Sequence, residues 1–234
     1  MFAYLFSRSF LPIHAACLTL QEKAYNPYYT LVCQELCRFS HSYKITLQFC
    51  LWDFLRELGE KNVGGVELLK RRDELVISSQ TKPISRSRME NVARAYSWWV
   101  ARDCCSLAIF KVSALLASRI GHMIMVHHWQ PVNFTALKDQ TKGFLREFLL
   151  QLFIDTQIST PSATESPQSL VQKITSRNRS SVEEVFWKAS VHEELRAGLH
   201  YFIRRVFEGD VEGNCNGFVA WAVEISTEVL GDSL

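Results

Sequence analysis

The chain has no run of apolar residues long enough to cross a membrane as a helix. Its longest apolar stretch, residues 104–129, is interrupted by Lys111, Arg119 and His122, whereas a spanning helix needs about 18 consecutive residues without such breaks. The apolar start, residues 1–20, lacks the positively charged region with which secretory signals begin. We therefore expect neither a membrane span nor secretion.

The motifs of common catalytic and metal sites are also missing. His192-Glu193-Glu194 has no second histidine at the H-E-x-x-H spacing, and the rings of the neighbours His127 and His128 diverge on a helix. No Gly-rich phosphate loop, nucleophile elbow or dinucleotide fingerprint occurs. We predict a protein that is not an enzyme and holds no cofactor, metal or small-molecule substrate. The alternative, an enzyme with an unrecognised site, requires a pocket with convergent polar residues of shifted pKa.

The seven cysteines do not form a recognisable disulfide or metal framework. Their number is odd, Cys33 and Cys37 stand four residues apart instead of in a C-x-x-C motif, and the adjacent Cys104 and Cys105 point to different sides of a helix. A buried free cysteine behaves as a small apolar side chain. We therefore expect reduced core thiols and a cytosolic or nuclear compartment, where disulfides are rare.

The composition is that of an ordinary globular protein with nearly balanced charge. The 234 residues are 47% apolar and 21% charged, with a net charge of +2. Three short basic clusters stand out, at Lys70-Arg71-Arg72, Arg86-Ser87-Arg88 and Arg177-Asn178-Arg179. Each is either a solvated helix end or loop, or a contact to RNA or an acidic partner.

Apolar residues recur at helical spacing in nearly every segment, and no alternating pattern long enough for a strand competes with them. Asn26 and Pro27 are a favourable cap and first residue for one such helix. The helices are expected at residues 27–39, 43–58, 66–76, 87–103, 104–117, 138–156, 182–207 with a break near Ala189 and Ser190, and 217–230. Residues 157–181, rich in Ser, Thr and Pro, are predicted to be a mobile loop within the domain. The sequence thus predicts an all-α fold of stacked antiparallel hairpins, a short solenoid with an exposed groove for binding.

Six short sequence motifs, in order along the chain, resemble those of one family. They are Gln21-Glu22-Lys23-Ala24-Tyr25-Asn26-Pro27-Tyr28-Tyr29; Leu51-Trp52-Asp53 with Glu57-Leu58; Asn91-Val92-Ala93-Arg94-Ala95-Tyr96 leading to Leu107-Ala108-Ile109-Phe110-Lys111; Pro131-Val132-Asn133-Phe134; Lys138-Asp139-Gln140-Thr141-Lys142-Gly143-Phe144-Leu145; and Gly198-Leu199-His200-Tyr201-Phe202-Ile203-Arg204-Arg205. Together they resemble the MA-3 domain, a HEAT-like helical module, in the version carried by nucleolar MIF-4G-domain proteins and the fungal suppressor of glycerol defect family.

The resemblance implies a non-catalytic protein-interaction scaffold in nucleolar small-subunit ribosome biogenesis and pre-rRNA processing. Its implied partners are a DEAD-box RNA helicase of the initiation-factor-4A type, the pre-ribosomal particle and RNA. In relatives, an upstream MIF-4G domain engages the helicase, and this chain is expected to carry only the accessory half. The alternative is an MA-3 adaptor of translation control or splicing that binds the same class of helicase.

Two segments depart from the family pattern, which otherwise spans residues 21–234. Residues 112–130 separate Lys111 from Pro131, which are joined directly in relatives. The segment begins with Val-Ser and ends with Gln, which are the residues that GTA-AGT and CAG, the two ends of an intron, encode when translated in frame. We therefore interpret it as a translated intron. The alternative is a genuine longer helix or loop. Residues 1–20 form an atypical N-terminal segment, since the family's first hairpin is missing. Apolar surface on the helix from Tyr28 to Phe39 is then expected to stay partly uncovered.

Six charged residues are the candidates for contact with a partner, because charges that bracket an apolar helix face commonly form the rim of an interface. They are Asp53, Arg56, Arg71, Arg72, Arg204 and Arg205. The alternative for each is an intramolecular salt bridge or a helix-end charge. On the helix expected at residues 43–58, we expect Leu51 and Trp52 to be buried while Asp53 and Arg56 remain accessible.

Five aromatic residues fit two interpretations, as core side chains or as a platform for bases or a peptide. They are Tyr25, Tyr28, Tyr29, Trp98 and Trp99.

Overall fold

The computed structural model describes residues 25–60, 84–110, 132–161, 165–212 and 217–231, and every regular element in these ranges is a helix. The elements are α2 (Pro27–Phe39), α3 (His41–Glu57), α5 (Arg86–Ala101), the 3₁₀ helix η1 (Leu107–Phe110), α6 (Asp139–Asp155), α7 (Pro167–Lys173), α8 (Arg179–Ser190), α9 (Glu193–Glu212) and α10 (Phe218–Gly231). The predicted all-α class is confirmed. The helix expected at 66–76 and the interpretations of residues 1–20 and 112–130 lie outside the described residues.

Most helices begin at residues that the sequence marks as caps. The Asn26 side chain accepts a hydrogen bond from the Tyr28 backbone N–H at 3.0 Å, and Pro27 follows it as predicted. Ser40 caps α3 in the same way, and the break expected near Ala189 and Ser190 separates α8 from α9. These boundaries follow from local chemistry, because each cap satisfies an N–H that the first helical turn leaves without a partner.

The helix predicted at 104–117 is wrong for its described residues. The chain leaves α5 at Ala101, and Asp103 adopts a left-handed conformation with φ of 58°. The Cys104 N–H then bonds back to the Trp99 carbonyl at 2.8 Å, which closes the helix end. After this turn only η1 forms before residue 110. Cys104 and Cys105 therefore lie in a turn, where both are buried.

The loop predicted at 157–181 also needs correction, because it contains α7. Ser166 caps this short helix by accepting a hydrogen bond from the Ser169 N–H at 3.3 Å, and Pro167 occupies its first turn. Leu170 is buried in the core and anchors the helix. Val171 and Ile174 also pack against the core, so three apolar residues in an otherwise polar segment dock this short helix.

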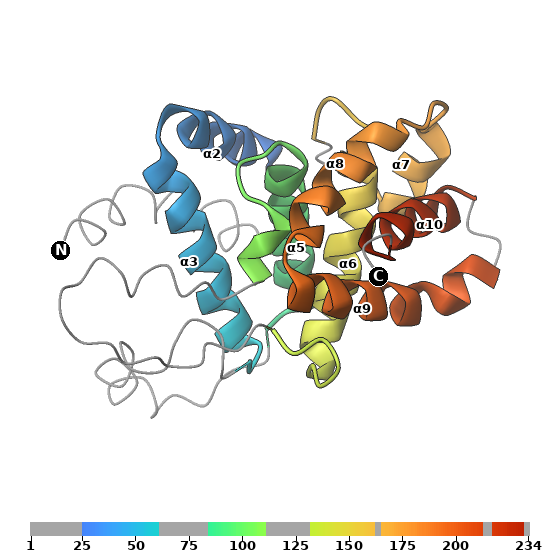
Figure 1. Ribbon diagram of the computed structural model, residues 1–234. Helices are drawn as coiled ribbons and strands as arrows, with labels where there is room; N and C mark the ends of the chain where they lie inside the picture. The colour runs from blue at the N-terminus through green and yellow to red at the C-terminus, as the bar shows by residue number, and fades with distance from the viewer. Residues whose placement is uncertain (1–24, 61–83, 111–131, 162–164, 213–216, 232–234) are drawn as a thin grey trace.

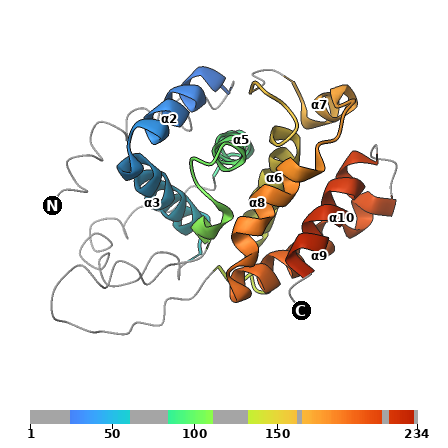
Figure 2. The same cartoon turned by 45° about the horizontal axis from the view of Figure 1, so that its top comes forward.

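Helices α5 and α6 form the centre of the stack (Figures 1 and 2). The hairpin of α2 and α3 lies on one side of this pair, and α8, α9 and α10 lie on the other. Aromatic contacts join the layers: Phe54 of α3 meets Phe144 of α6 with ring centroids 5.1 Å apart, and Phe153 of α6 lies 5.9 Å from Phe186 of α8. The core thus continues through all layers, as expected for stacked helices.

Buried aromatic side chains also fix neighbouring helices through their polar atoms. Four such hydrogen bonds are Trp52 Nε1 to the Ile109 carbonyl at 2.7 Å, Tyr96 hydroxyl to the Leu47 carbonyl at 2.8 Å, Trp98 Nε1 to Gln34 Oε1 at 2.7 Å, and Trp99 Nε1 to the Thr30 carbonyl at 3.0 Å. Tyr25, Trp98 and Trp99 are therefore core residues, whereas Tyr28 and Tyr29 are exposed.

The described residues on either side of segment 111–131 are hydrogen-bonded to each other. The Val132 N–H donates to the Phe110 carbonyl at 3.3 Å, and both residues are buried. The ring of Phe134 lies 6.4 Å from that of Phe110. One backbone hydrogen bond therefore joins the described chain that ends at residue 110 to the described chain that begins at residue 132.

Deleting residues 112–130 is expected to preserve the fold and to raise the melting temperature and the yield. Joining Lys111 to Pro131 leaves two residues between the hydrogen-bonded Phe110 and Val132, the number that a β-turn requires. Loop length changes the free energy of unfolding by only about 0.6 kcal/mol per doubling. Thermal unfolding followed by circular dichroism measures the effect. Because proline is unfavourable at the third position of common turns, the same deletion with Pro131→Gly is the control; a fall of several degrees in both variants contradicts the prediction.

Candidate interaction surfaces

The outer face of α3 carries the first two predicted contact residues. Leu51 and Trp52 are buried, Asp53 is exposed and Arg56 is partly exposed, as the helical period predicted. The Asp53 carboxylate binds the Arg56 guanidinium, whose Nε also donates to the Trp52 carbonyl at 3.3 Å. The intramolecular ion pair given as the alternative is therefore present, and contact of these two residues with a partner stays a prediction.

A second ion pair extends this face onto α5. The Arg88 guanidinium lies 2.8 Å from the Glu57 carboxylate and 5.7 Å from the centroid of the Phe54 ring. With Asp53 and Arg56, the face carries two acids and two bases. Its charges are balanced, so it has no net attraction for a strongly charged partner. Arg71 and Arg72 lie outside the described residues.

The outer face of α9 carries Arg204 and Arg205 together with Tyr201. All three side chains are exposed. Arg205 donates a hydrogen bond to the Tyr201 hydroxyl, and its guanidinium carbon lies 5.9 Å from the ring centroid. Within the described ranges neither arginine forms an ion pair with a carboxylate. Sequence analysis missed Tyr201, although its position three and four residues before two arginines was a sufficient signal.

The structure does not bring the predicted contact residues into one site. Helix α3 lies at one side of the stack and α9 at the other, in both views (Figures 1 and 2). Asp53 and Arg56 therefore belong to a different surface from Arg204 and Arg205. A single small partner cannot contact both surfaces.

Exposed apolar side chains mark a further surface on α2. Tyr28 is 74% exposed and Phe39 87% exposed, and Val32 lies between them on the same face. The uncovered apolar surface expected on this helix is therefore present. Trp187 of α8 and Val191, which caps the end of that helix, are also exposed, four residues apart on the side opposite the buried stripe. Contiguous exposed apolar patches mark interaction sites, whereas single exposed apolar residues are ordinary.

A buried carboxyl group, which sequence analysis did not single out, lies between α5 and α6. Asp155 accepts a hydrogen bond from Gln151 Nε2 at 3.0 Å, and its Oδ2 lies 2.6 Å from Ser97 Oγ. Burial raises the pKa of Asp155 to about 7. Ser97 Oγ also lies 2.9 Å from the Arg94 carbonyl. Because Ser97 has one proton for two acceptors, a protonated Asp155 satisfies both contacts. The signal in the sequence was a carboxylate at the end of the apolar run 152–154.

Disulfides, metal-ligand groups and membrane-spanning helices are all absent from the described residues. The five described cysteines are free and buried. The residues that the structure describes contain no group of three His, Cys, Asp or Glu side chains placed to hold a metal ion. Among the described helices, none has the length and apolar character of a membrane span.

A stack of helices that exposes charged and apolar side chains on several faces is the architecture of a helical interaction module. Comparison with known proteins shows which family the chain resembles. The MA3 domain family model matches residues 8–74, which include α2 and α3 and also residues 8–20 of the segment predicted to be atypical.

Two named relatives support the same assignment. The chain is 28% identical to Suppressor of glycerol defect protein 1 of Schizosaccharomyces pombe over 133 residues, which are 57% of this chain and 13% of the relative. It is 41% identical to Nucleolar MIF4G domain-containing protein 1 of Homo sapiens over 39 residues, 17% of this chain and 4% of the relative. No solved structure matches the chain. The predicted resemblance to the MA3 domain of this family is confirmed, and the chain spans about an eighth of the first relative's length.

Proposed function

We propose that the chain is a non-catalytic interaction scaffold in nucleolar small-subunit ribosome biogenesis and pre-rRNA processing. Its proposed partners are a DEAD-box RNA helicase of the initiation-factor-4A type and the pre-ribosomal particle. The observation that carries the proposal is the MA3 match over residues 8–74 together with relatives whose names place one of them in the nucleolus. MA3 domains and these relatives are adaptors, which supports an interaction role for the chain.

The second candidate is an MA3 adaptor of translation control or splicing. It rests on the same family match, because the matching model is described only as the MA3 domain. The Asn26-Pro27-Tyr28-Tyr29 and Leu51-Trp52-Asp53 motifs favour the nucleolar branch. The two candidates differ in compartment, so the location of the tagged full chain in cells distinguishes them: nucleolar accumulation supports the first, and exclusion from the nucleolus supports the second.

The α2–α3 hairpin is the surface that we assign to the helicase. It is the described part of the family match, and it places the apolar Tyr28 and Phe39 on the same hairpin as the charged Asp53 and Arg56. An apolar centre with a polar rim is the usual anatomy of a protein–protein interface. The balanced charge of this face also fits a protein partner better than a nucleic acid.

Binding of the purified full chain to a panel of purified DEAD-box helicases tests the assignment. Tyr28→Ala with Phe39→Ala is expected to weaken helicase binding at least tenfold, because exposed aromatic residues at the centre of an interface dominate its affinity. The matched control is Trp187→Ala on α8, which removes an exposed aromatic residue from a different layer. Equal affinities of the two variants would exclude the α2–α3 surface, and absence of binding to every helicase would refute the proposed partner.

A further inference from the structure

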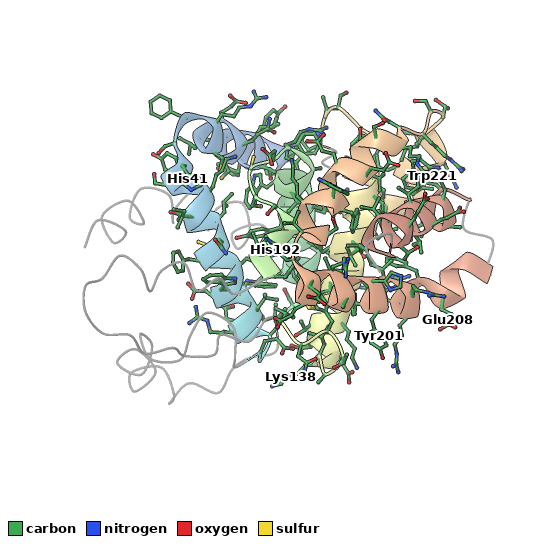
Figure 3. The ribbon with its side chains drawn as sticks, viewed as in Figure 1. His41, Lys138, His192, Tyr201, Glu208 and Trp221 are labelled. Atoms are coloured by element: carbon green, nitrogen blue, oxygen red, sulfur yellow. The ribbon has the colours of Figure 1, made fainter. Side chains whose placement is uncertain are left out.

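We propose that the outer face of α9 binds single-stranded RNA through Tyr201, Arg204 and Arg205. This inference deepens the proposed function and rests on it, because it assigns to one surface the RNA that a pre-ribosomal scaffold meets. The surface differs from the α2–α3 face assigned to the helicase (Figures 1 and 2). Figure 3 shows Tyr201 and Glu208 along the outer edge of α9.

The three side chains form one continuous patch. Residues three and four apart are neighbours on a helix surface, so Tyr201 lies next to both arginines. The opposite face of α9 is fixed in the core, since Phe202 lies 5.9 Å from Phe134 and Phe207 lies 5.9 Å from Phe153. The patch is therefore presented by a firmly packed helix and does not need to form on binding.

The two arginines keep their charge available for a ligand. Other exposed arginines on the described helices are neutralised by carboxylates, as in Arg38 with Glu35 at 3.1 Å and Arg86 with Glu90 at 2.8 Å. By contrast, Arg205 donates to the neutral Tyr201 hydroxyl, and no ion pair of Arg204 is found in the described part of the chain. Glu208 stands within one turn and forms no ion pair with either of them.

A third guanidinium reaches the same helix from α6. The Arg146 guanidinium carbon lies 5.8 Å from the ring centroid of Phe207, which is one turn along α9 from Arg204. Phe207 is fully buried, so Arg146 lies toward the core-facing side of α9 and is not counted in the patch on the outer face. Acidic residues stand at both ends of α9, with Glu193 and Glu194 in its first turn and Glu208, Asp210 and Glu212 in its last turns, and they limit the patch to the middle of the helix.

Single-stranded RNA fits this chemistry better than an acidic peptide. Guanidinium groups bind phosphate oxygens through paired hydrogen bonds. An exposed tyrosine beside them provides a face on which an unpaired base can stack. A peptide would need apolar area or a groove for its other side chains, and the patch is the outer face of one helix. Two arginines define contacts to about two phosphates, so the expected site is a short stretch of unpaired nucleotides.

Fluorescence anisotropy with a labelled 20-nucleotide oligouridine tests the proposal on the full chain. The double variant Arg204→Ala with Arg205→Ala is expected to bind at least tenfold more weakly at 100 mM KCl. Because each phosphate contact to a single strand contributes about 0.7 to the slope of log affinity against log salt, the double variant should also lower that slope by about 1.4. Tyr201→Leu is expected to weaken binding several-fold with an unchanged slope, because it removes stacking and no charge.

The matched control is Arg38→Ala with Arg86→Ala, which changes the net charge equally but removes arginines that already pair with carboxylates. An equal loss in this control, no binding of the oligouridine to the unaltered chain, or stronger binding of polyglutamate than of RNA would each overturn the proposal. Helicase binding by the Arg204→Ala, Arg205→Ala variant is measured in parallel. If it persists while RNA binding by the unaltered chain fails, only the RNA surface is wrong; if RNA binds and no helicase does, the helicase assignment is wrong.

Discussion

Replacing Trp52 by alanine is expected to lower the free energy of unfolding by about 3–5 kcal/mol. The indole is 3% exposed, donates to the Ile109 carbonyl at 2.7 Å and meets the Phe49 ring edge-to-face with centroids 5.3 Å apart. Its removal leaves a cavity and deprives the buried Ile109 carbonyl of this donor, and both effects destabilise the native state. Urea denaturation followed by circular dichroism measures the loss.

Trp187→Ala is the control for Trp52→Ala, because it removes the same side chain from a position that is 64% exposed. Its effect should stay within about 0.5 kcal/mol, the usual range for surface substitutions. A loss below about 1 kcal/mol for Trp52→Ala would place Trp52 on the surface and make it a candidate contact residue instead. Similar losses for both variants would likewise contradict the packing described here.

Local sequence rules predicted helix starts and buried stripes well, and the end of α5 shows where they fail. The alternation of Trp52 and Asp53 between core and surface needs only the period of one helix. The reversal at Asp103 is accompanied by contacts with distant residues: Lys44 Nζ donates to the Asp103 carbonyl at 2.6 Å, and Lys188 Nζ lies 2.9 Å from its carboxylate. These partners are 59 and 85 residues away in the sequence. The apolar pattern of a single helix gives no information about contacts with residues so far away in the sequence.

In the candidate surfaces too, some features depend on one helix alone and others depend on contacts between helices. The pairing of Asp53 with Arg56 was foreseeable from their spacing of three residues, whereas the addition of Arg88 required the packing of α5 against α3. The sequence also could not show that α3, which carries Asp53, and α9, which carries Arg204 and Arg205, lie at different sides of the stack (Figure 2). Spacing therefore predicts which side chains share a helix face, and the stacking of helices decides which faces can act together.

The free energy of unfolding is expected to fall as the pH rises from about 4 to about 7. An aspartate in an unfolded chain has a pKa near 3.9, whereas burial raises the pKa of Asp155 to about 7 in the folded chain. Between these values the folded state holds a proton that the unfolded state has lost, so each pH unit lowers stability by about 1.4 kcal/mol. Below pH 4 the full contribution of Asp155 is present, and above pH 7 it is lost. The loss from this group amounts to roughly 4 kcal/mol at most.

Asp155→Asn separates this group from the other carboxyls. Burial also raises the pKa of Glu147, so that residue contributes to the pH profile in the same direction. The asparagine amide can replace the neutral acid, with its NH₂ group donating to Ser97 Oγ and its oxygen accepting from Gln151 Nε2. The variant should therefore show a flatter pH profile and exceed the unaltered chain in stability at pH 8 by about 2–4 kcal/mol. Chemical denaturation at pH 4.5, 6 and 8 measures both. Parallel profiles for the two proteins would mean that Asp155 is ionised without cost in the folded chain, and the protonated bridge to Ser97 would then be excluded.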